Sequence, residues 1–289
     1  MVKPVNKRMT GKPEMEINSL QNARVKNVVR LRDGRHRQKQ DRFLVDGIRE
    51  LSRANRGGIE IVEVFVCREI CTEEQQQRLE EVLNQLRQDK GTSTRGAWNL
   101  FQVSKNVFHK MAFGDRAEGV LAVAQVPHWE LEDLKLPEKP LVAVIEGIEK
   151  PGNIGAVIRS ADAAAIDAVI LADCRTDLFN PNAIRASLGT VLTLPIRETS
   201  TPASLTWLRA QGLPIFTARV DGSVPYTEID FRCGGAIVLG SEADGLTDEW
   251  SGDDIQAVRL PMLGVADSLN ISATAAVLFF EALRQREQT

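Results

Sequence analysis

Apolar residues in the second half of the chain recur in short continuous runs separated by helical patterns. Runs rich in Val, Ile and Leu predict buried strands at 141–146, 168–172, 193–196, 214–220, 235–240 and 258–261. Helical patterns begin near Asn153, Pro181 and Pro202, and a last helix is expected over 269–284. Continuous apolar strands that alternate with helices predict a parallel sheet covered on both faces. We therefore expect an α/β fold here.

The first half of the chain shows a shorter alternation. Apolar segments at 43–47, 59–66 and 119–126 predict strands, and helical patterns follow the first two, so we expect a smaller α/β domain. Segment 127–140 holds three prolines and mixed charge, which is typical of a linker. The predicted organisation is a flexible basic N-terminus (1–16), a small domain (17–126), a linker (127–140) and a parallel-sheet domain (141–289). Residues 91–97 are expected to form an exposed loop.

Composition narrows the class of protein. The 289 residues, 43% of them hydrophobic and 26% charged, are enough for two domain cores. No apolar run reaches the roughly 18 residues of a membrane span, and the first residues lack the apolar core of a signal peptide, so we expect a cytoplasmic protein without membrane contact. Cys67, Cys71, Cys174 and Cys233 form no C-x-x-C pair and have no His at zinc spacing. Free thiols and no metal site are expected.

The net charge of −3 hides an asymmetry. Residues 1–56 carry a net charge of +9, so the rest of the chain carries −12. A cationic block of this kind is typical of polyanion binding, although a solvated helix face explains it equally well on charge alone. The candidate RNA-binding residues in this block are Arg30, Arg32, Arg35, Arg37, Lys39 and Arg42.

Three segments that lead from a predicted strand into a loop or helix carry polar residues: 151–164, 238–246 and 260–286. In the last one, Ser268, Asn270 and Ser272 lie where the final helix is expected to begin. Helix starts leave backbone N–H groups unpaired, and such side chains can cap them or face a ligand. Because ligands of parallel sheets bind beyond the carboxyl ends of the strands, we expect the three segments to form one site.

Individual residues of these segments have more than one interpretation. Gly152 and Gly155 form G-x-x-G, which is not the dinucleotide G-x-G-x-x-G pattern, but Asp173 lies at the spacing of its acidic partner. A nicotinamide-dependent oxidoreductase therefore stays open. Arg159 lies one turn after Gly155 and could hold a phosphate or be a surface residue. Asn153 could be only a helix cap, and Glu242 only a turn carboxylate.

Taken together, the three segments match the motifs of one family. Asn153, Gly155 and Arg159 fit N-x-G-x-x-x-R, and Gly240, Glu242 and Gly245 fit G-x-E-x-x-G. The third pattern, P-M-x-G-x-x-x-S-L-N-x-S, is met by Pro261, Met262, Gly264, Ser268, Leu269, Asn270 and Ser272. In these motifs the chain resembles the SpoU (TrmH-type) branch of the SPOUT RNA methyltransferases. The resemblance covers 141–286, roughly half of the chain.

The resemblance extends more loosely to 17–126, which looks like the ribosomal-protein-like substrate-binding domain of the ribosomal-RNA and antibiotic-resistance members. It implies a trefoil knot at the end of the catalytic domain, with S-adenosylmethionine bound there. The residues it implies for the cofactor are Leu239, Gly240, Gly245, Leu260, Met262 and Leu269. It also implies that Arg185 lines the approach of RNA to the site.

The family's catalytic residue corresponds to Arg159, with Asn153, Glu242, Ser268 and Asn270 around it. A guanidinium stays protonated at physiological pH, so we expect Arg159 to grip a phosphate and stabilise a developing alkoxide, and not to act as a simple base. The remaining four residues would orient Arg159 and the ribose through hydrogen bonds.

The resemblance implies methylation of a ribose 2'-hydroxyl in structured RNA, with 23S ribosomal RNA as the favoured substrate. A tRNA 2'-O-methyltransferase and a non-catalytic RNA-binding protein are the alternatives. A homodimer is expected because the apolar residues of the last helix cannot all face one core, unless its own domain buries it completely. These residues are Ile271, Ala275, Val277, Leu278, Phe279, Phe280 and Leu283.

Overall fold

The computed structural model describes residues 15–88, 98–114 and 118–287, which form two compact units. One unit runs up to Leu51 and includes Glu60–Gln125, and the other joins Ser52–Ile59 to the chain from Val126 onward. Most of the predicted N-terminal segment 1–16 and all of the predicted loop 91–97 lie outside the described residues. The predicted domain limits stay predictions.

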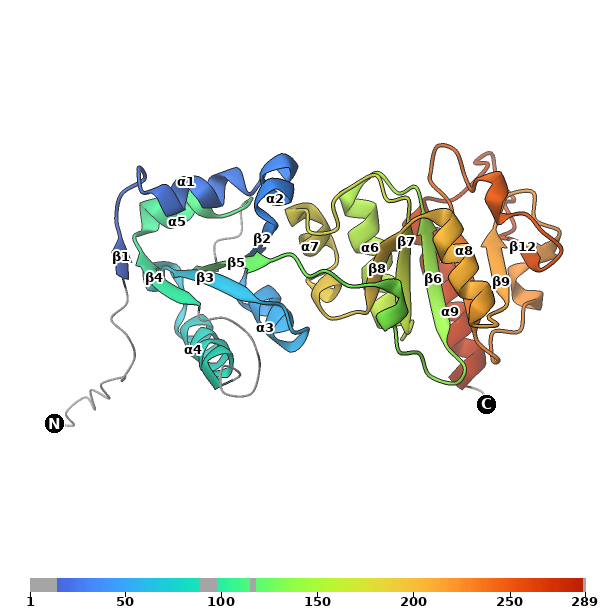
Figure 1. Cartoon of the computed structure of the whole chain (residues 1–289), viewed down its shortest axis with the longest axis horizontal. Helices are drawn as coiled ribbons and strands as arrows, with labels where there is room; N and C mark the ends of the chain where they lie inside the picture. The colour runs from blue at the N-terminus through green and yellow to red at the C-terminus, as the bar shows by residue number, and fades with distance from the viewer. Residues whose placement is uncertain (1–14, 89–97, 115–117, 288–289) are drawn as a thin grey trace. The chain divides into compact units, whose positions relative to one another are not determined.

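The first unit is a five-stranded mixed sheet with helices on both faces. Its strand order is β1-β4-β3-β5-β2, in which β5 pairs antiparallel with β2 and β3, and β4 pairs parallel with β1 and β3. Figure 1 shows α1, α2 and α5 on one side of this sheet and α3 and α4 on the other. The strands are β1 (Met15–Ile17), β2 (Arg42–Asp46), β3 (Ile61–Val66), β4 (Asn99–Val103) and β5 (Val120–Gln125). The helices are α1 (Ala23–Arg30), α2 (Gly34–Gln40), α4 (Glu73–Gln88), α5 (Lys105–Met111) and the first half of α3 (Ile48–Arg56), whose residues from Ser52 on belong to the other unit.

The second unit is built on a seven-stranded sheet in which every pairing is parallel, as the apolar runs predicted. The strand order is β10-β12-β9-β11-β6-β7-β8. Its strands are β6 (Leu141–Glu146), β7 (Ala168–Ala172), β8 (Ile196–Thr199), β9 (Ile215–Ala218), β10 (Val224–Pro225), β11 (Gly235–Leu239) and β12 (Ile255–Arg259). The predicted α/β class is confirmed, and the trefoil knot stays a prediction.

Helices cover both faces of this sheet. Its main helices are α6 (Pro151–Ala163), α7 (Pro181–Ala186), α8 (Thr201–Ala210) and α9 (Ile271–Glu287). Figure 1 shows α8 in front of the sheet and α9 behind it. Leu205 and Leu208 of α8 pack on Val142 and Val144 of β6 in one apolar cluster. None of the helices in the described part of the chain is long and apolar enough to cross a membrane.

The predicted strand at 193–196 is wrong, because β8 begins only at Ile196. Thr193 and Pro195 are exposed, and the nitrogens of Thr193 and Leu194 donate to the Thr190 carbonyl oxygen, both at 3.0 Å, in the turn that precedes β8. Pro195 has no N–H group for a strand pairing, so the strand starts only after it.

Gly155 allows α6 and α7 to pack closely. A Cβ built on Gly155 would lie 2.5 Å from the Ala183 carbonyl oxygen, 2.7 Å from the Ala186 Cβ and 2.9 Å from the Ser187 nitrogen. Two of these three atoms belong to the backbone and cannot rotate away. The glycine of the first motif therefore serves helix packing.

We predict that Gly155→Ala lowers the free energy of unfolding by about 1–3 kcal/mol, the usual cost of overpacking. Gly152→Ala is the matched control, because it lies in the same helix and its Cβ would meet no atom within 4 Å. Urea unfolding of both variants measures the difference. Equal stability of the two variants would show that α7 yields easily and that Gly155 is not needed for packing.

Candidate active site

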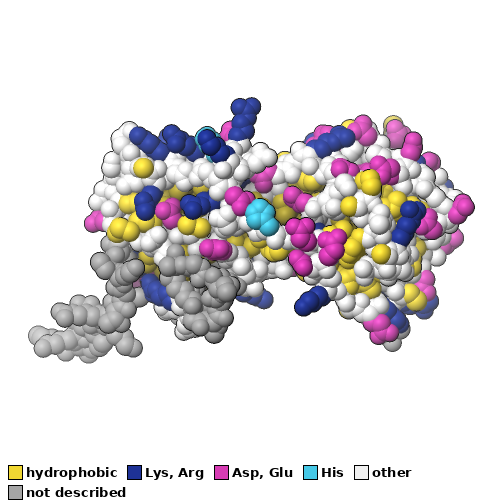
Figure 2. Space-filling view, in the orientation of Figure 1, with side chains coloured by type: hydrophobic (Ala, Val, Ile, Leu, Met, Phe, Trp, Pro, Cys, Tyr) yellow, Lys and Arg dark blue, Asp and Glu magenta, His cyan; other side chains and the backbone are white. Residues whose placement is uncertain are grey.

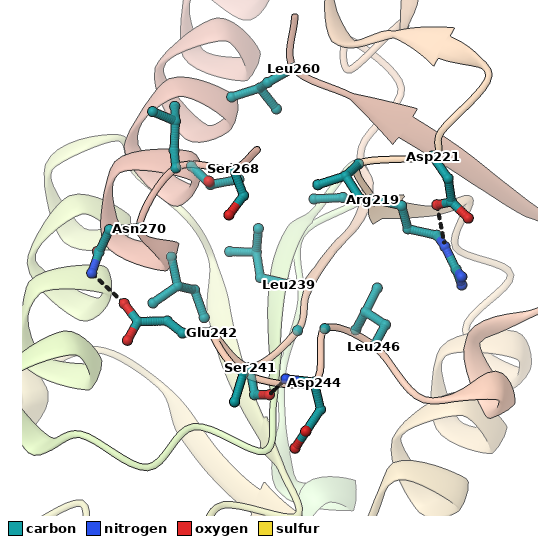
Figure 3. Close-up of a pocket in the computed structure, with 18 of the residues that line it drawn as sticks. Arg219, Asp221, Leu239, Ser241, Glu242, Asp244, Leu246, Leu260, Ser268 and Asn270 are labelled. Atoms are coloured by element: carbon teal, nitrogen blue, oxygen red, sulfur yellow. Dashed lines mark hydrogen bonds and ion pairs between the residues drawn. The ribbon is translucent and has the colours of Figure 1, made fainter. Parts of the chain in front are cut away.

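A cavity of about 660 Å³ lies beyond the carboxyl ends of β9, β11 and β12 (Figure 3). Its walls come from the loop after β9, the loop after β11, the chain after β12 and the first turn of α9. This is the edge of a parallel sheet at which ligands bind. Two of the three predicted segments, 238–246 and 260–286, therefore meet at one site.

All six residues that the sequence suggested for the cofactor line this cavity: Leu239, Gly240, Gly245, Leu260, Met262 and Leu269. Figure 3 shows Leu239 between the side chains of Leu260 and Leu246. The polar residues Ser268 and Asn270 also line the cavity. The lining thus combines apolar side chains with polar and charged ones, which suits a ligand that carries both an aromatic base and polar groups.

The loop after β11 is a tight turn. The Ser241 nitrogen donates to the Gly245 carbonyl at 3.0 Å, and the Gly245 nitrogen donates to the Ser241 carbonyl at 3.2 Å. Gly245 has a φ of +70°, and a Cβ on Gly240 would lie 2.2 Å from the Gly245 carbonyl carbon. The two glycines of the second motif thus close the turn, which presents Glu242 at its tip.

Glu242 joins three segments that are far apart in the sequence. Its carboxylate accepts hydrogen bonds from Lys150 Nζ at 2.6 Å, from Asn153 Nδ2 at 2.9 Å and from Asn270 Nδ2. The hydrogen bond from Lys150 is the main reason that the pKa of Glu242 lies below its ordinary value. Glu242 is therefore a carboxylate at neutral pH, held in place by one cation and two amides.

Asn270 links this cluster to α9. Its Oδ1 accepts hydrogen bonds from the Ser272 nitrogen at 2.9 Å and from Ser272 Oγ at 2.6 Å. The side chain therefore satisfies an unpaired N–H at the start of α9 and also orients the Glu242 carboxylate. Capping and a role in the site, which were alternatives for such residues, occur together in Asn270.

Arg159 is not brought into the cavity of its own chain. It is exposed on α6, and within the described residues it has no hydrogen-bond or ion-pair partner. It follows Asn153 by six residues, which is about 1.7 helical turns, so the two side chains leave α6 in different directions. The structure thus gathers Asn153, Glu242, Ser268 and Asn270 around the cavity rim but leaves Arg159 apart.

The basic residues of the first unit have different environments. Arg30, Arg35 and Lys39 are exposed, and Figure 2 shows Lys and Arg side chains in a row over α1 and α2. Arg32 is half-buried and donates to the carbonyl oxygens of Lys110 and Ala112 at 2.7 and 2.6 Å. Arg42, in β2, is half-buried too.

Arg37 differs from its neighbours because it is only 3% exposed. Its Nη1 donates to the carbonyl oxygens of Leu31 and Arg32 at 2.9 and 2.8 Å. These carbonyls belong to the end of α1 and the turn after it, where backbone acceptors lack helical partners. The placement makes Arg37 a packing residue and removes it from the RNA-binding surface that we expected.

Two parts of the site were not predicted from the sequence. Lys150 matches no motif position that we used, although it lies between a predicted strand and the first motif, three residues before Asn153. Arg219, Val220 and Asp221 line the cavity opposite the Glu242 loop (Figure 3). They follow β9, and their place at the carboxyl end of a predicted parallel strand was the available signal.

The predicted alternative of a nicotinamide-dependent enzyme depended on Asp173. Its Oδ2 accepts a hydrogen bond from the Thr201 nitrogen at 2.9 Å, so the carboxylate sits at the first residue of α8. Asp173 is not among the residues that line the cavity. A ribose-binding role for Asp173 is therefore not supported.

The cavity at the carboxyl edge of the parallel sheet and the hydrogen-bonded cluster around Glu242 form the candidate active site of an α/β protein. Comparison with known proteins identifies its family. Residues 140–280 match the SpoU rRNA Methylase family, and residues 22–122 match the MRM3-like substrate binding domain. The chain belongs to the SpoU rRNA methylase family, as its motifs predicted.

Three similar proteins illustrate the relationship. The 23S rRNA (guanosine(2553)-2'-O)-methyltransferase RlmP of Bacillus subtilis (strain 168) is 26% identical over 265 residues, which cover 92% of this chain and 98% of RlmP. The 23S rRNA (guanosine-2'-O-)-methyltransferase RlmB of Xylella fastidiosa (strain 9a5c) is 36% identical over 180 residues, covering 60% and 72% of the two chains. The AdoMet-bound rRNA methyltransferase from Sinorhizobium meliloti superposes with a TM-score of 0.80 at 28% identity, covering 93% and 97%.

Proposed function

We propose that this chain is an S-adenosylmethionine-dependent enzyme that methylates a ribose 2'-hydroxyl of ribosomal RNA, and specifically of 23S rRNA. The observation that carries the proposal is the cavity that Glu242 and its hydrogen-bonded cluster help to line, in a chain of the SpoU family. RlmP and RlmB are named as 23S rRNA 2'-O-methyltransferases, and the similar enzyme from Sinorhizobium meliloti is bound to AdoMet.

The cavity fits S-adenosylmethionine in size and chemistry. Leu239, Leu260 and Leu269 offer apolar surface for the adenine ring, and the turn from Gly240 to Gly245 lets the cofactor approach the backbone. When bound, the cofactor supplies an activated methyl group. The chain must bring the 2'-oxygen in line with that group, and such positioning accounts for much of the rate in reactions of two bound partners.

A ribose hydroxyl is a poor nucleophile until its proton leaves or its anion is stabilised. We assign the stabilisation to Arg159, whose permanent charge can hold an RNA phosphate and a developing alkoxide. Asn153, Glu242, Ser268 and Asn270 orient the ribose at the rim of the cavity. Because Arg159 does not line the cavity of its own chain, its role requires an RNA phosphate beside the cavity or a second copy of the chain.

The exposed cations over α1 and α2 form the proposed RNA-binding surface. Arg185 of α7 belongs to the other unit and is half-buried, and its contact with RNA is a separate part of the proposal. Arg30, Arg35 and Lys39 can pair with phosphates without leaving a buried partner behind, since all three are exposed. The region matched by the MRM3-like substrate binding domain includes them. The limits 17–126 for this domain, 127–140 for the linker and 141–289 for the methyltransferase domain are part of the proposal.

A homodimer is the proposed assembly. Burial divides α9 into two sides, with Ala275, Leu278 and Phe279 inside and Phe280 47% exposed. Val277, which lies three residues before Phe280, is only half-buried. Residues at this spacing form one apolar stripe on a helix, and a second copy of the chain would cover it.

The tests below distinguish the proposed function from two alternatives. A tRNA 2'-O-methyltransferase would use the same site on another RNA, and a non-catalytic RNA-binding protein would use only the cationic surface. Neither is favoured by the family or by the two named relatives. The cytoplasmic location stays a prediction.

We predict that Arg159→Ala lowers methyl transfer to ribosomal RNA about 100-fold or more, the usual cost of removing a group that stabilises an oxyanion. AdoMet affinity should stay nearly unchanged, because Arg159 does not line the cavity. Transfer of labelled methyl groups and calorimetry measure the two quantities. The control is Arg209→Ala, which removes an exposed arginine of α8 that pairs with Asp254. Near-normal turnover of the Arg159 variant would show that this residue has no part in the mechanism. Methylation of tRNA but not of ribosomal RNA by the wild-type chain would show that tRNA is the substrate.

Replacing Arg35 and Lys39 by Gln should weaken RNA binding and flatten its salt dependence, by about 0.7–0.9 in the log–log slope for each phosphate that is no longer neutralised. RNA titrations at several salt concentrations give this slope. Arg37→Gln is the control from the same helix, because its buried guanidinium holds backbone carbonyls; it should lower the melting temperature and leave the slope of the folded protein unchanged. If the slope is the same with and without Arg35 and Lys39, these residues belong to an ordinary solvated helix face and not to an RNA-binding surface.

Phe280→Arg should convert a dimer into a monomer in light scattering at micromolar concentration, because the new charge would have to be buried in the contact. Phe280→Leu keeps an apolar side chain at the same position and should remain dimeric. A wild-type chain that is already monomeric would refute the proposed assembly.

A further inference from the structure

Glu146 is a buried carboxylate outside the site described so far. It is the last residue of β6 and is only 4% exposed. Within the described residues it has no ion-pair partner. Burying a carboxylate is costly unless hydrogen bonds replace its lost hydration. The donors of these hydrogen bonds therefore indicate the role of Glu146.

Three hydrogen bonds from two distant segments converge on Glu146. Thr201 Oγ1 donates to Oε1 at 2.8 Å, and Thr247 Oγ1 donates to the same oxygen at 2.7 Å. The Thr247 nitrogen donates to Oε2 at 2.8 Å. Thr201 opens α8, whereas Thr247 follows directly on the loop that lines the cavity.

The loop from Gly240 to Leu246 is therefore fixed at both ends. Its first residue follows β11, which pairs with β6, and its far end is tied to the carboxylate at the end of the same strand β6. Between these ends the loop carries Glu242, and all seven of its residues line the cavity. A shift of Thr247 would therefore move the cavity wall and Glu242 together.

We propose that Glu146 is a positioning residue for the methyl-donor site, acting through Thr247 to hold the loop 240–246 in its binding geometry. Glu146 does not line the cavity itself. The inference rests on the proposed function in one respect, since it takes the cavity to be the AdoMet site. If Glu146 had a purely structural role, loss of its hydrogen bond to α8 and loss of its hydrogen bond to the loop would have the same effect on AdoMet binding.

Thr201 and Thr247 provide a matched pair that separates these two roles. Thr201→Val and Thr247→Val each remove one hydroxyl that donates to the same carboxylate oxygen, at nearly equal distances. Thr201 is 1% exposed and Thr247 is exposed, so loss of stability alone predicts greater damage from the Thr201 change. Positioning of the loop predicts weaker AdoMet binding only from the Thr247 change.

The experiment is calorimetric titration of the full chain with AdoMet, well below the melting temperature of each variant. Glu146→Leu should weaken binding about tenfold or more, the order expected when hydrogen bonds to a charged group are removed. Glu146→Gln should recover most of the affinity, because its amide can accept from the Thr247 nitrogen and donate to a hydroxyl. Thr247→Val should weaken binding severalfold and Thr201→Val less than twofold. Wild-type affinity in Glu146→Leu, or equal losses of affinity in the two threonine variants, would overturn the proposal.

Amide hydrogen exchange without cofactor provides a second measurement. Exchange across 241–247 should accelerate in Glu146→Leu and Thr247→Val but not in Thr201→Val, and unchanged exchange in all three would contradict the proposal. A wild-type chain that binds no AdoMet would refute the proposed function, and exchange would then still decide whether Glu146 holds the loop. If Glu146→Leu does not fold, the threonine pair gives the decision alone.

Discussion

The carboxylate of Glu242 joins the loop before α6, the turn after β11 and the start of α9. All three segments lie at the edge of the sheet, and the Glu242 carboxylate links them to one another. Lys150 keeps the carboxylate charged, and Asn153 and Asn270 set its orientation. The cavity wall, the first turn of α9 and the first turn of α6 therefore depend on one another.

A parallel sheet makes this arrangement possible. All of its strands end at the same edge, so loops that are far apart in the sequence can share one carboxylate. The glycines contribute close packing: Gly155 admits α7 against α6, and Gly240 lies against the backbone of Gly245. Glu146 is a second carboxylate that links distant segments. It is buried, and it connects the far end of the Glu242 loop to β6. The positions of the residues at the cavity rim thus depend on loops that are held mainly by hydrogen bonds to polar side chains.

The sequence predicted the second unit better than the first, for physical reasons. Strands buried on both faces read as continuous apolar runs, which identified β6, β7 and β11. By contrast β4 mixes polar with apolar residues, and β1 has only three residues, so neither was predicted. The second and third motifs predicted the cavity because each follows a strand. Charge could not predict that Arg37 turns inward among exposed neighbours, because unpaired carbonyls at the end of α1 decide its position. Spacing puts Asn153 and Arg159 on different sides of α6, but it could not show which of these sides faces the cavity.

The most direct test of the account is a crystal structure of the chain with S-adenosylhomocysteine, the product that remains after methyl transfer. The account predicts the adenine ring against Leu239, Leu260 and Leu269, with the Glu242 carboxylate still bonded to Asn153 and Asn270. A ligand bound outside this cavity, or a Glu242 carboxylate separated from both amides in the complex, would contradict it.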